Sequence, residues 1–120
     1  MSENPIHGGP SSVSFTRLVD AIDLIRALAP EMKALTATLF LKVCEHGEVP
    51  MSDLVAYAEA PTSTVGRHLQ TLLEWERVRV PGLGLIKTYD DAADRRRKIV
   101  ALTAKGREVR TAIAGVIGGA

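Results

Sequence analysis

Residues 52–75 read SDLVAYAEAPTSTVGRHLQTLLEW, and this stretch decides the fold. Apolar residues at helical spacing predict a short helix over 53–58 and a longer one from about 62 to 75. Pro61 separates the two, because proline disfavours helical geometry in the residue before it. Two short helices with a tight break between them predict a helix-turn-helix.

The segments on either side of this motif complete the order of elements. Upstream, apolar residues recur every three or four positions over 14–29 and 31–45, which predicts two helices. Downstream, the segments 85–89 and 98–102 predict a β-hairpin with a charged tip, and helical spacing returns from Thr103. The fold class is therefore mainly α with a small β-hairpin. We interpret it as a winged helix-turn-helix, a three-helix core plus a wing, with flanking helices at both ends.

The length and local composition favour one domain preceded by an arm. Residues 1–12 are rich in Gly, Pro, Ser and Asn and predict a flexible arm. The remaining residues, 13–120, fit a single winged-helix DNA-binding domain, because a chain of 120 residues suits one compact unit. Its flanking helices are expected to form a dimer interface through the apolar stripe of 14–29 and the apolar residues near the C-terminus.

The charge is unevenly distributed along the chain. The net charge is +1, but residues 1–60 carry four basic and eight acidic groups, whereas residues 61–120 carry eleven basic and six acidic groups. The halves therefore differ, at −4 and +5, and such asymmetry indicates a polyanionic partner. The N-terminus lacks the pattern of a secretory signal, and no apolar run is long enough for a membrane span. We expect a cytoplasmic, nucleoid-associated protein with no membrane partner.

No pattern of catalytic, metal-binding or cofactor-binding residues stands out. The histidines His7, His46 and His68 have no metal-ligand spacing, and neither nucleotide-binding fingerprint is complete. We therefore expect no enzyme activity, no catalytic residue, no metal and no cofactor. The single cysteine, Cys44, excludes an internal disulfide. It lies on the apolar side of its helix, which favours a buried structural thiol over the alternative of a redox sensor.

The helix over 62–75 is the candidate recognition helix. With Val65, Leu69, Leu72 and Leu73 turned inward, its outer side carries small, polar or basic residues that leave access to a DNA groove. Arginine and glutamine can bind guanine and adenine in a bidentate way, and hydroxyl groups suit phosphate. The residues expected to contact DNA from this helix are Thr62, Ser63, Thr64, Gly66, Arg67 and Gln70.

The tip of the predicted hairpin is the second candidate element. Four consecutive cations, Arg95, Arg96, Arg97 and Lys98, follow Asp94. A run of charges is usually a solvated surface, but an arginine on a projecting turn can enter a narrow minor groove. We expect these four residues to contact DNA, and Asp94 to orient one of the arginines by a charge-assisted hydrogen bond.

The same stretch carries a resemblance to a known family. Residues 94–106, DRRRKIVALTAKG, resemble the wing and following helix of the multiple-antibiotic-resistance regulator (MarR) family, with its Asp-x-Arg, strand and Leu-Thr-x-x-Gly. Residues 63–67, STVGR, are similar to its recognition helix, and the resemblance spans about 31–110. It implies a homodimeric winged-helix regulator of palindromic DNA, often released by small phenolic or aromatic ligands. Residues 77–83 are an insertion relative to the family pattern.

Two functions from different classes are consistent with these features. The first is a sequence-specific regulator of transcription that binds double-stranded DNA, acting as a homodimeric repressor. The alternative is a winged-helix adaptor or antagonist that binds another regulator, since fold does not fix function. A small-molecule effector follows from the resemblance alone, because no residue singles out a site for one.

Overall fold

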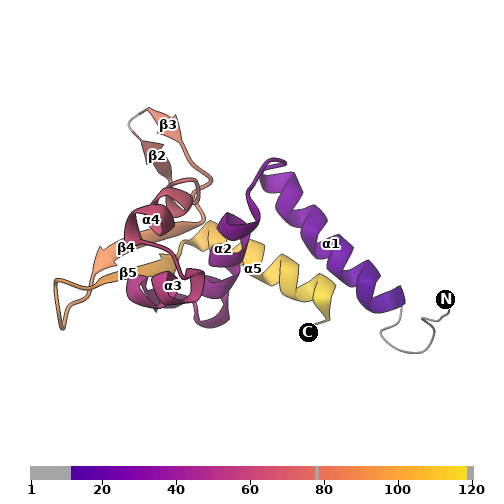
Figure 1. Cartoon of the computed structure of the whole chain (residues 1–120). Coiled ribbons are helices and arrows are strands. Elements are labelled where there is room, and N and C mark those ends of the chain that lie inside the picture. The colour runs from indigo at the N-terminus through magenta and orange to yellow at the C-terminus, as the bar shows by residue number, and fades with distance from the viewer. Residues whose placement is uncertain (1–11, 78, 119–120) are drawn as a thin grey trace. The chain divides into compact units, whose positions relative to one another are not determined.

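The structure is a computed structural model that describes residues 12–77 and 79–118. In chain order the elements are α1 (Ser12–Leu28), α2 (Ala34–His46), β1 (Glu48–Pro50), α3 (Met51–Ala58), α4 (Thr62–Gln70), β2 (Trp75–Arg77), β3 (Val80–Pro81), β4 (Ile86–Asp90), β5 (Lys98–Leu102) and α5 (Ala104–Ile117) (Figure 1). This order confirms the predicted winged helix-turn-helix, with α3 and α4 as the motif and the loop between β4 and β5 as the wing.

The chain forms two compact units. Residues 32–110, here called the winged-helix unit, contain α2 to β5 and the start of α5. Residues 1–31 and 111–120, here called the terminal unit, contribute α1 and the end of α5. Of the expected flexible arm, residues 1–11 lie outside the described residues, and Ser12 begins α1.

The core of the winged-helix unit is aliphatic and lies where α2, α3 and α4 meet the sheet. Helices α2, α3 and α4 contact one another, and α2 and α3 also contact β5. Helix α2 ends at Gly47, whose φ of 85° is the left-handed conformation that glycine adopts without strain. The largest fully buried side chains are Leu39, Phe40, Val43, Leu54, Val65, Leu69, Leu72, Leu85, Ile86 and Val100.

The three-stranded sheet connects the wing to the helix-turn-helix. Its order is β1-β5-β4, and both pairings are antiparallel. On one edge of β5, Val100 lies opposite Val49, and on the other it lies opposite Thr88. The sequence did not predict β1, because three residues between two helices carry no periodic signal. Because β1 pairs with β5, the start of α3 lies beside the central strand of the sheet.

The candidate recognition helix, α4, is shorter than predicted. It ends at Gln70 and not near Trp75. The amides of Leu72 and Leu73 donate to the carbonyl groups three residues earlier, so the helix closes in a tight turn. The Leu72 carbonyl then accepts hydrogen bonds from the amides of Leu85 and Ile86, at 2.8 and 3.1 Å. These tertiary hydrogen bonds use the carbonyl group that a longer α4 would need for its own backbone bonds. The helix therefore ends although the apolar spacing continues.

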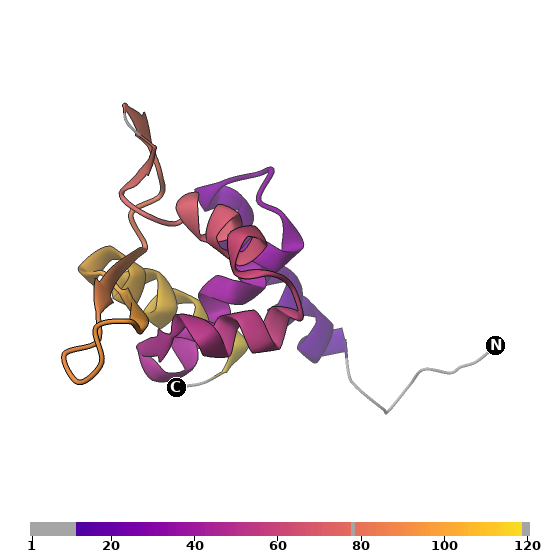
Figure 2. The same ribbon diagram turned by 60° about the vertical axis from the view of Figure 1, so that its left-hand side comes forward.

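The inserted segment forms most of a second hairpin. Strands β2 and β3 pair antiparallel, with an irregularity in register between Trp75 and Arg77. At its base the amide of Gly82 donates to the Glu74 carbonyl at 2.9 Å. Figures 1 and 2 show this hairpin and the wing projecting in different directions from the helices of the winged-helix unit.

The helix at the C-terminal end begins next to Thr103, as predicted, and continues to Ile117. Gly118 follows with a φ of +90°, a conformation that ends a helix readily. Glycine at 115 therefore lowers the local helix propensity without ending the helix.

Two helical glycines differ in what surrounds them, and this predicts opposite effects on stability. A Cβ at Gly106 would lie 2.1 Å from the Leu85 carbonyl oxygen, whereas one at Gly66 would meet nothing within 4 Å. We expect Gly106→Ala to lower the free energy of unfolding by about 1–3 kcal/mol. The matched Gly66→Ala is expected to raise it by about 0.5–1 kcal/mol, since alanine is the better helix former. Denaturant unfolding measures the free energy of unfolding of both variants. A Gly106→Ala variant as stable as the parent would contradict the close packing of α5 against Leu85, the residue before β4.

Candidate nucleic-acid interface

Helix α4 presents a polar and basic outer side. Its inner side is held by Val65 and Leu69, which are fully or almost fully buried. The predicted contact residues lie on the remaining surface: Thr62, Ser63, Arg67 and Gln70 are exposed, and Thr64 and Gly66 are partly exposed. This outer side can offer hydroxyl, guanidinium and amide groups to a partner.

A buried polar contact fixes α4 against α2. The Thr36 hydroxyl and the His68 Nδ1 atom lie 2.8 Å apart, and Thr36 is only 3% exposed. Because a buried polar group costs free energy when left unpaired, this bond favours one orientation of α4. Sequence reasoning placed His68 on the helix but did not find its partner, which lies 32 residues away. His68 thus turns inward, next to the outward-facing Arg67.

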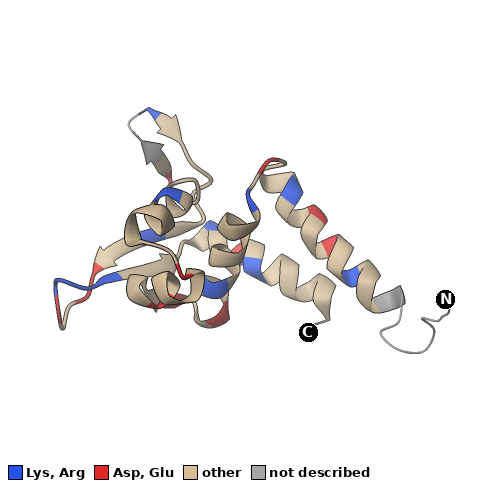
Figure 3. Cartoon of the chain, viewed as in Figure 1, with Lys and Arg blue, Asp and Glu red and all other residues tan. Residues whose placement is uncertain are grey.

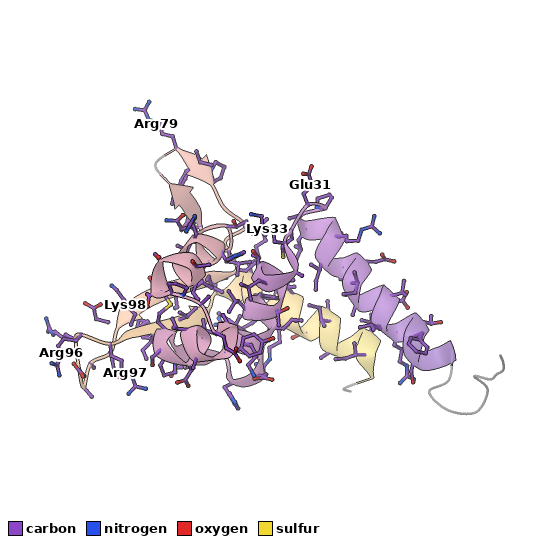
Figure 4. The ribbon with its side chains drawn as sticks, viewed as in Figure 1. Glu31, Lys33, Arg79, Arg96, Arg97 and Lys98 are labelled. Atoms are coloured by element: carbon purple, nitrogen blue, oxygen red, sulfur yellow. The ribbon has the colours of Figure 1, made fainter. Side chains whose placement is uncertain are left out.

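The wing presents its cations at a projecting loop. Arg95, Arg96, Arg97 and Lys98 are all exposed. Figure 4 shows Arg96, Arg97 and Lys98 extending from the end of the β4–β5 hairpin. Arg95, Arg96 and Arg97 therefore lie in the loop, and Lys98 begins β5 directly after it.

Carboxylates within the wing hold most of these cations. Arg96 Nε lies 3.2 Å from Asp94 Oδ1, which also accepts a hydrogen bond from the Arg96 amide at 3.1 Å. Arg97 Nη1 lies 3.7 Å from Asp91 Oδ2, and Lys98 Nζ lies 2.9 Å from Asp90 Oδ1.

The wing is therefore less positive than its run of cations indicates. Residues 90–98 carry four cations and three carboxylates, so the net charge is +1. Exposed pairs of this kind contribute little to stability, but they restrict where each side chain lies. Among the four wing cations, Arg95 makes no ion pair with any residue that the structure describes.

The charge of the wing belongs to a wider pattern in the winged-helix unit. This unit has 13 basic and 10 acidic residues, a net charge of +3, and the terminal unit is the negative part of the chain. Figure 3 shows Lys and Arg on α4, along the wing and just before β3. The cation just before β3 is Arg79, which the sequence analysis did not single out because it lies in the inserted segment.

The described residues contain no arrangement of metal ligands. No group of three or more His, Cys, Asp or Glu side chains in 12–77 and 79–118 is placed to hold a metal ion. None of the helices in these ranges has the length and apolar character needed to cross a membrane.

Solved structures similar to this chain are transcriptional regulators. Regulator Tm0710 from Thermotoga maritima is 19% identical, with a TM-score of 0.69 over 90% of this chain and 69% of that one. MepR from S. aureus, solved as a DNA complex, is 21% identical, with a TM-score of 0.67 over 90% of this chain and 81% of MepR. A MarR-family regulator from Rhodococcus sp. RHA1 is 20% identical, with a TM-score of 0.60 over 92% of this chain and 71% of that one.

These similarities confirm that the chain has a MarR-like winged-helix fold. No protein-family model matches the sequence. A search of curated proteins finds no match either. The likeness is therefore one of fold.

The environment of Cys44 predicts an unreactive thiol. The side chain is half-buried, and burial raises its pKa to about 11, although the charge of Arg110 acts in the opposite direction. At pH 8 only about one thiol in a thousand would then be ionised. We expect alkylation in the folded protein to be far slower than in urea, and to rise about tenfold per pH unit up to the pKa. Fast alkylation of the folded protein at neutral pH would contradict this and reopen the redox alternative.

Proposed function

We propose that this protein is a sequence-specific regulator of transcription that binds double-stranded DNA as a homodimer and acts as a repressor. The observation that carries the proposal is the pairing of an exposed polar and basic α4 with a cationic wing in one winged-helix unit. The similar fold of MepR, which was solved as a DNA complex, supports it.

In this proposal α4 enters the major groove. The buried contacts of Val65, Leu69 and His68 leave Arg67 and Gln70 free to face base edges, where guanine and adenine are their preferred bidentate partners. Thr62, Ser63 and Thr64 lie in the first turn, where their hydroxyl groups suit phosphate oxygens. Gly66 adds no side chain, which allows the helix backbone to approach the groove closely.

The wing is proposed to contact the adjacent minor groove or its phosphates. Arg95 is the strongest candidate for insertion, because the other wing cations already have carboxylate partners. Asp94 is proposed to orient Arg96 through the bonds described above. A narrow minor groove has an enhanced negative potential that favours an arginine side chain.

The terminal unit is proposed to supply the dimer contact. Phe15, Leu18, Val19 and Ile22 follow one another at spacings of three and four on α1, and each is about half exposed. Exposed apolar residues gathered on one helix face are typical of a protein interface. A second copy of the chain would cover them, with each side chain contributing roughly 1 kcal/mol.

A dimer of this kind would place two copies of α4 on successive turns of one DNA face, about 34 Å apart. Bound across a promoter, it would exclude the transcription machinery. The rival adaptor function requires no affinity for duplex DNA, and the net charge of +3 on the winged-helix unit favours the DNA-binding proposal.

Selection of bound fragments from random duplex DNA tests the proposal. We expect a two-fold symmetric motif whose half-sites lie about 10 base pairs apart. On the selected duplex, Arg67→Ala is expected to cost about 1–3 kcal/mol and to relax specificity at one position of each half-site. Arg95→Ala should weaken binding and flatten the dependence of affinity on salt by about one unit per protomer.

The control for both variants is Arg26→Ala. This residue is an exposed arginine of α1 that pairs with Asp23 and lies in the terminal unit. It should leave affinity and salt dependence unchanged. Recovery of no enriched sequence, together with no salt-dependent binding, would exclude the DNA-binding proposal and favour the adaptor.

The dimer contact is tested by a charge placed on the apolar face of α1. Leu18→Asp should convert the dimer to a monomer in sedimentation experiments, because a carboxylate cannot be covered by the partner's apolar side chains without a large desolvation cost. Ala27→Asp, at an exposed position of the same helix that points away from this apolar face, should leave the dimer intact. A Leu18→Asp protein that still sediments as a dimer would place the interface elsewhere.

A further inference from the structure

The β2–β3 hairpin is held firmly at its base, next to the end of α4. The amide of Leu83 donates to the Thr71 carbonyl at 2.9 Å, and that of Gly84 donates to the Leu73 carbonyl at 3.0 Å. A Cβ at Gly82 would lie 2.0 Å from the Leu73 carbonyl oxygen, so only glycine fits at this point of the return strand. The base of the hairpin is therefore fixed relative to the recognition helix.

The described side chains of the hairpin are exposed and chemically suited to a partner. Trp75 is 56% exposed. Arg79 is also exposed. Figure 4 shows Arg79 at the end of the hairpin, pointing away from the helices. Tryptophan and arginine are the residue types most enriched where interfaces gain their binding energy.

The position of the hairpin relates it to the proposed DNA surface. Figures 1 and 2 show the β2–β3 hairpin and the wing projecting in different directions from the region of α4. A helix in the major groove has a sugar-phosphate backbone on each side, since the groove is only about 12 Å wide. An element that projects from the end of α4 in a direction different from the wing is therefore placed to reach phosphates that the wing does not contact.

The charge of the hairpin favours a polyanion as its partner. By sequence, residues 75–81 contain Arg77 and Arg79 against Glu76, a net charge of +1. This equals the net charge of the wing residues 90–98. A second copy of the chain is the weaker alternative, because the broad apolar face of α1 already offers a contact for it.

We propose that the β2–β3 hairpin is a second DNA-contacting element, which binds the phosphate backbone next to the end of α4. Arg79 donates hydrogen bonds to a phosphate, and the sugar-phosphate backbone covers Trp75. This inference rests on the proposed function and adds to it a contact that the similar fold alone does not supply.

Trp75 reports directly on the hairpin, because it is the only tryptophan of the chain. The probe is a labelled, mixed-sequence duplex of about 40 base pairs at low salt, where phosphate contacts dominate binding. The anisotropy of the label measures binding, and acrylamide quenching of Trp75 measures cover of the hairpin. At saturation the quenching constant should fall by about half, since the exposed indole loses its access to solvent.

Removal of the Arg79 charge provides the second readout. Arg79→Ala should lower affinity about 3- to 10-fold and reduce the slope of log affinity against log salt by about one unit per protomer. Arg79→Gly should do the same, and it guards against misfolding because Arg79 has a φ of 65°, which glycine adopts more easily. Arg26→Ala again serves as the control that leaves both quantities unchanged.

The outcomes separate this inference from the proposed function. Absence of any anisotropy change would remove the proposed function, and the hairpin contact with it. Saturating anisotropy with an unchanged Trp75 quenching constant, or with an unchanged salt slope in both Arg79 variants, would overturn the hairpin contact alone. Protection of Trp75 in the free protein that is lost on dilution would assign the hairpin to a protein contact, and would likewise overturn the inference.

Discussion

Strand β5 is the element on which the rest of the winged-helix unit depends. It is the central strand of the three-stranded sheet, pairing with β1 on one edge and with β4 on the other. Val100 and Leu102 are fully or almost fully buried, and the Leu102 amide donates to the Gly47 carbonyl at the end of α2. Because β1 leads directly into the helix-turn-helix and β4 into the wing, one strand fixes these two elements relative to each other.

A second set of contacts fixes α4 and the β2–β3 hairpin relative to β4. Leu72 follows the end of α4, its side chain is fully buried, and its carbonyl accepts hydrogen bonds from the amides of Leu85 and Ile86 at the start of β4. The Thr36–His68 contact then sets the rotation of α4 about its axis. These contacts turn the polar residues of α4 outward as a consequence of packing. The surface is thus prepared before any partner arrives, which reduces the entropy lost on binding.

The local and the tertiary parts of this structure differ in how well sequence predicts them. Apolar periodicity predicted α1, α2 and α3 closely, because each has a repeating apolar face. Strand β5 was predicted at its observed bounds of 98 and 102, since Ile99 and Val100 are β-branched and follow a charged turn. The run of apolar residues after Gln70 misled the prediction, because Leu72 and Leu73 continue a helical pattern while their backbone groups bond to residues 84–86. Such contacts between distant residues leave no periodic trace.

The candidate interface shows the same division. The residues of α4 and the wing could be selected from their types and their place in the motif. The ion pairs of the wing could not be predicted. The order of residues along the chain does not show that Asp90, Asp91 and Asp94 each pair with a wing cation. Arg79 was missed because it lies in the insertion. The family pattern has no equivalent of this segment, so it gives no expectation for the residues in it. The extra length forms a hairpin because Gly82 allows the return strand to pass against the Leu73 carbonyl.

The central claim is that α4 and the wing of one protomer engage a single duplex together. Amide hydrogen exchange in the presence and absence of saturating duplex DNA tests it most directly. We predict slower exchange on binding in both 62–70 and 91–97, with no comparable change at residues 53–58 of α3. Saturated binding with protection confined to one of these two segments, or present in neither, would contradict the claim.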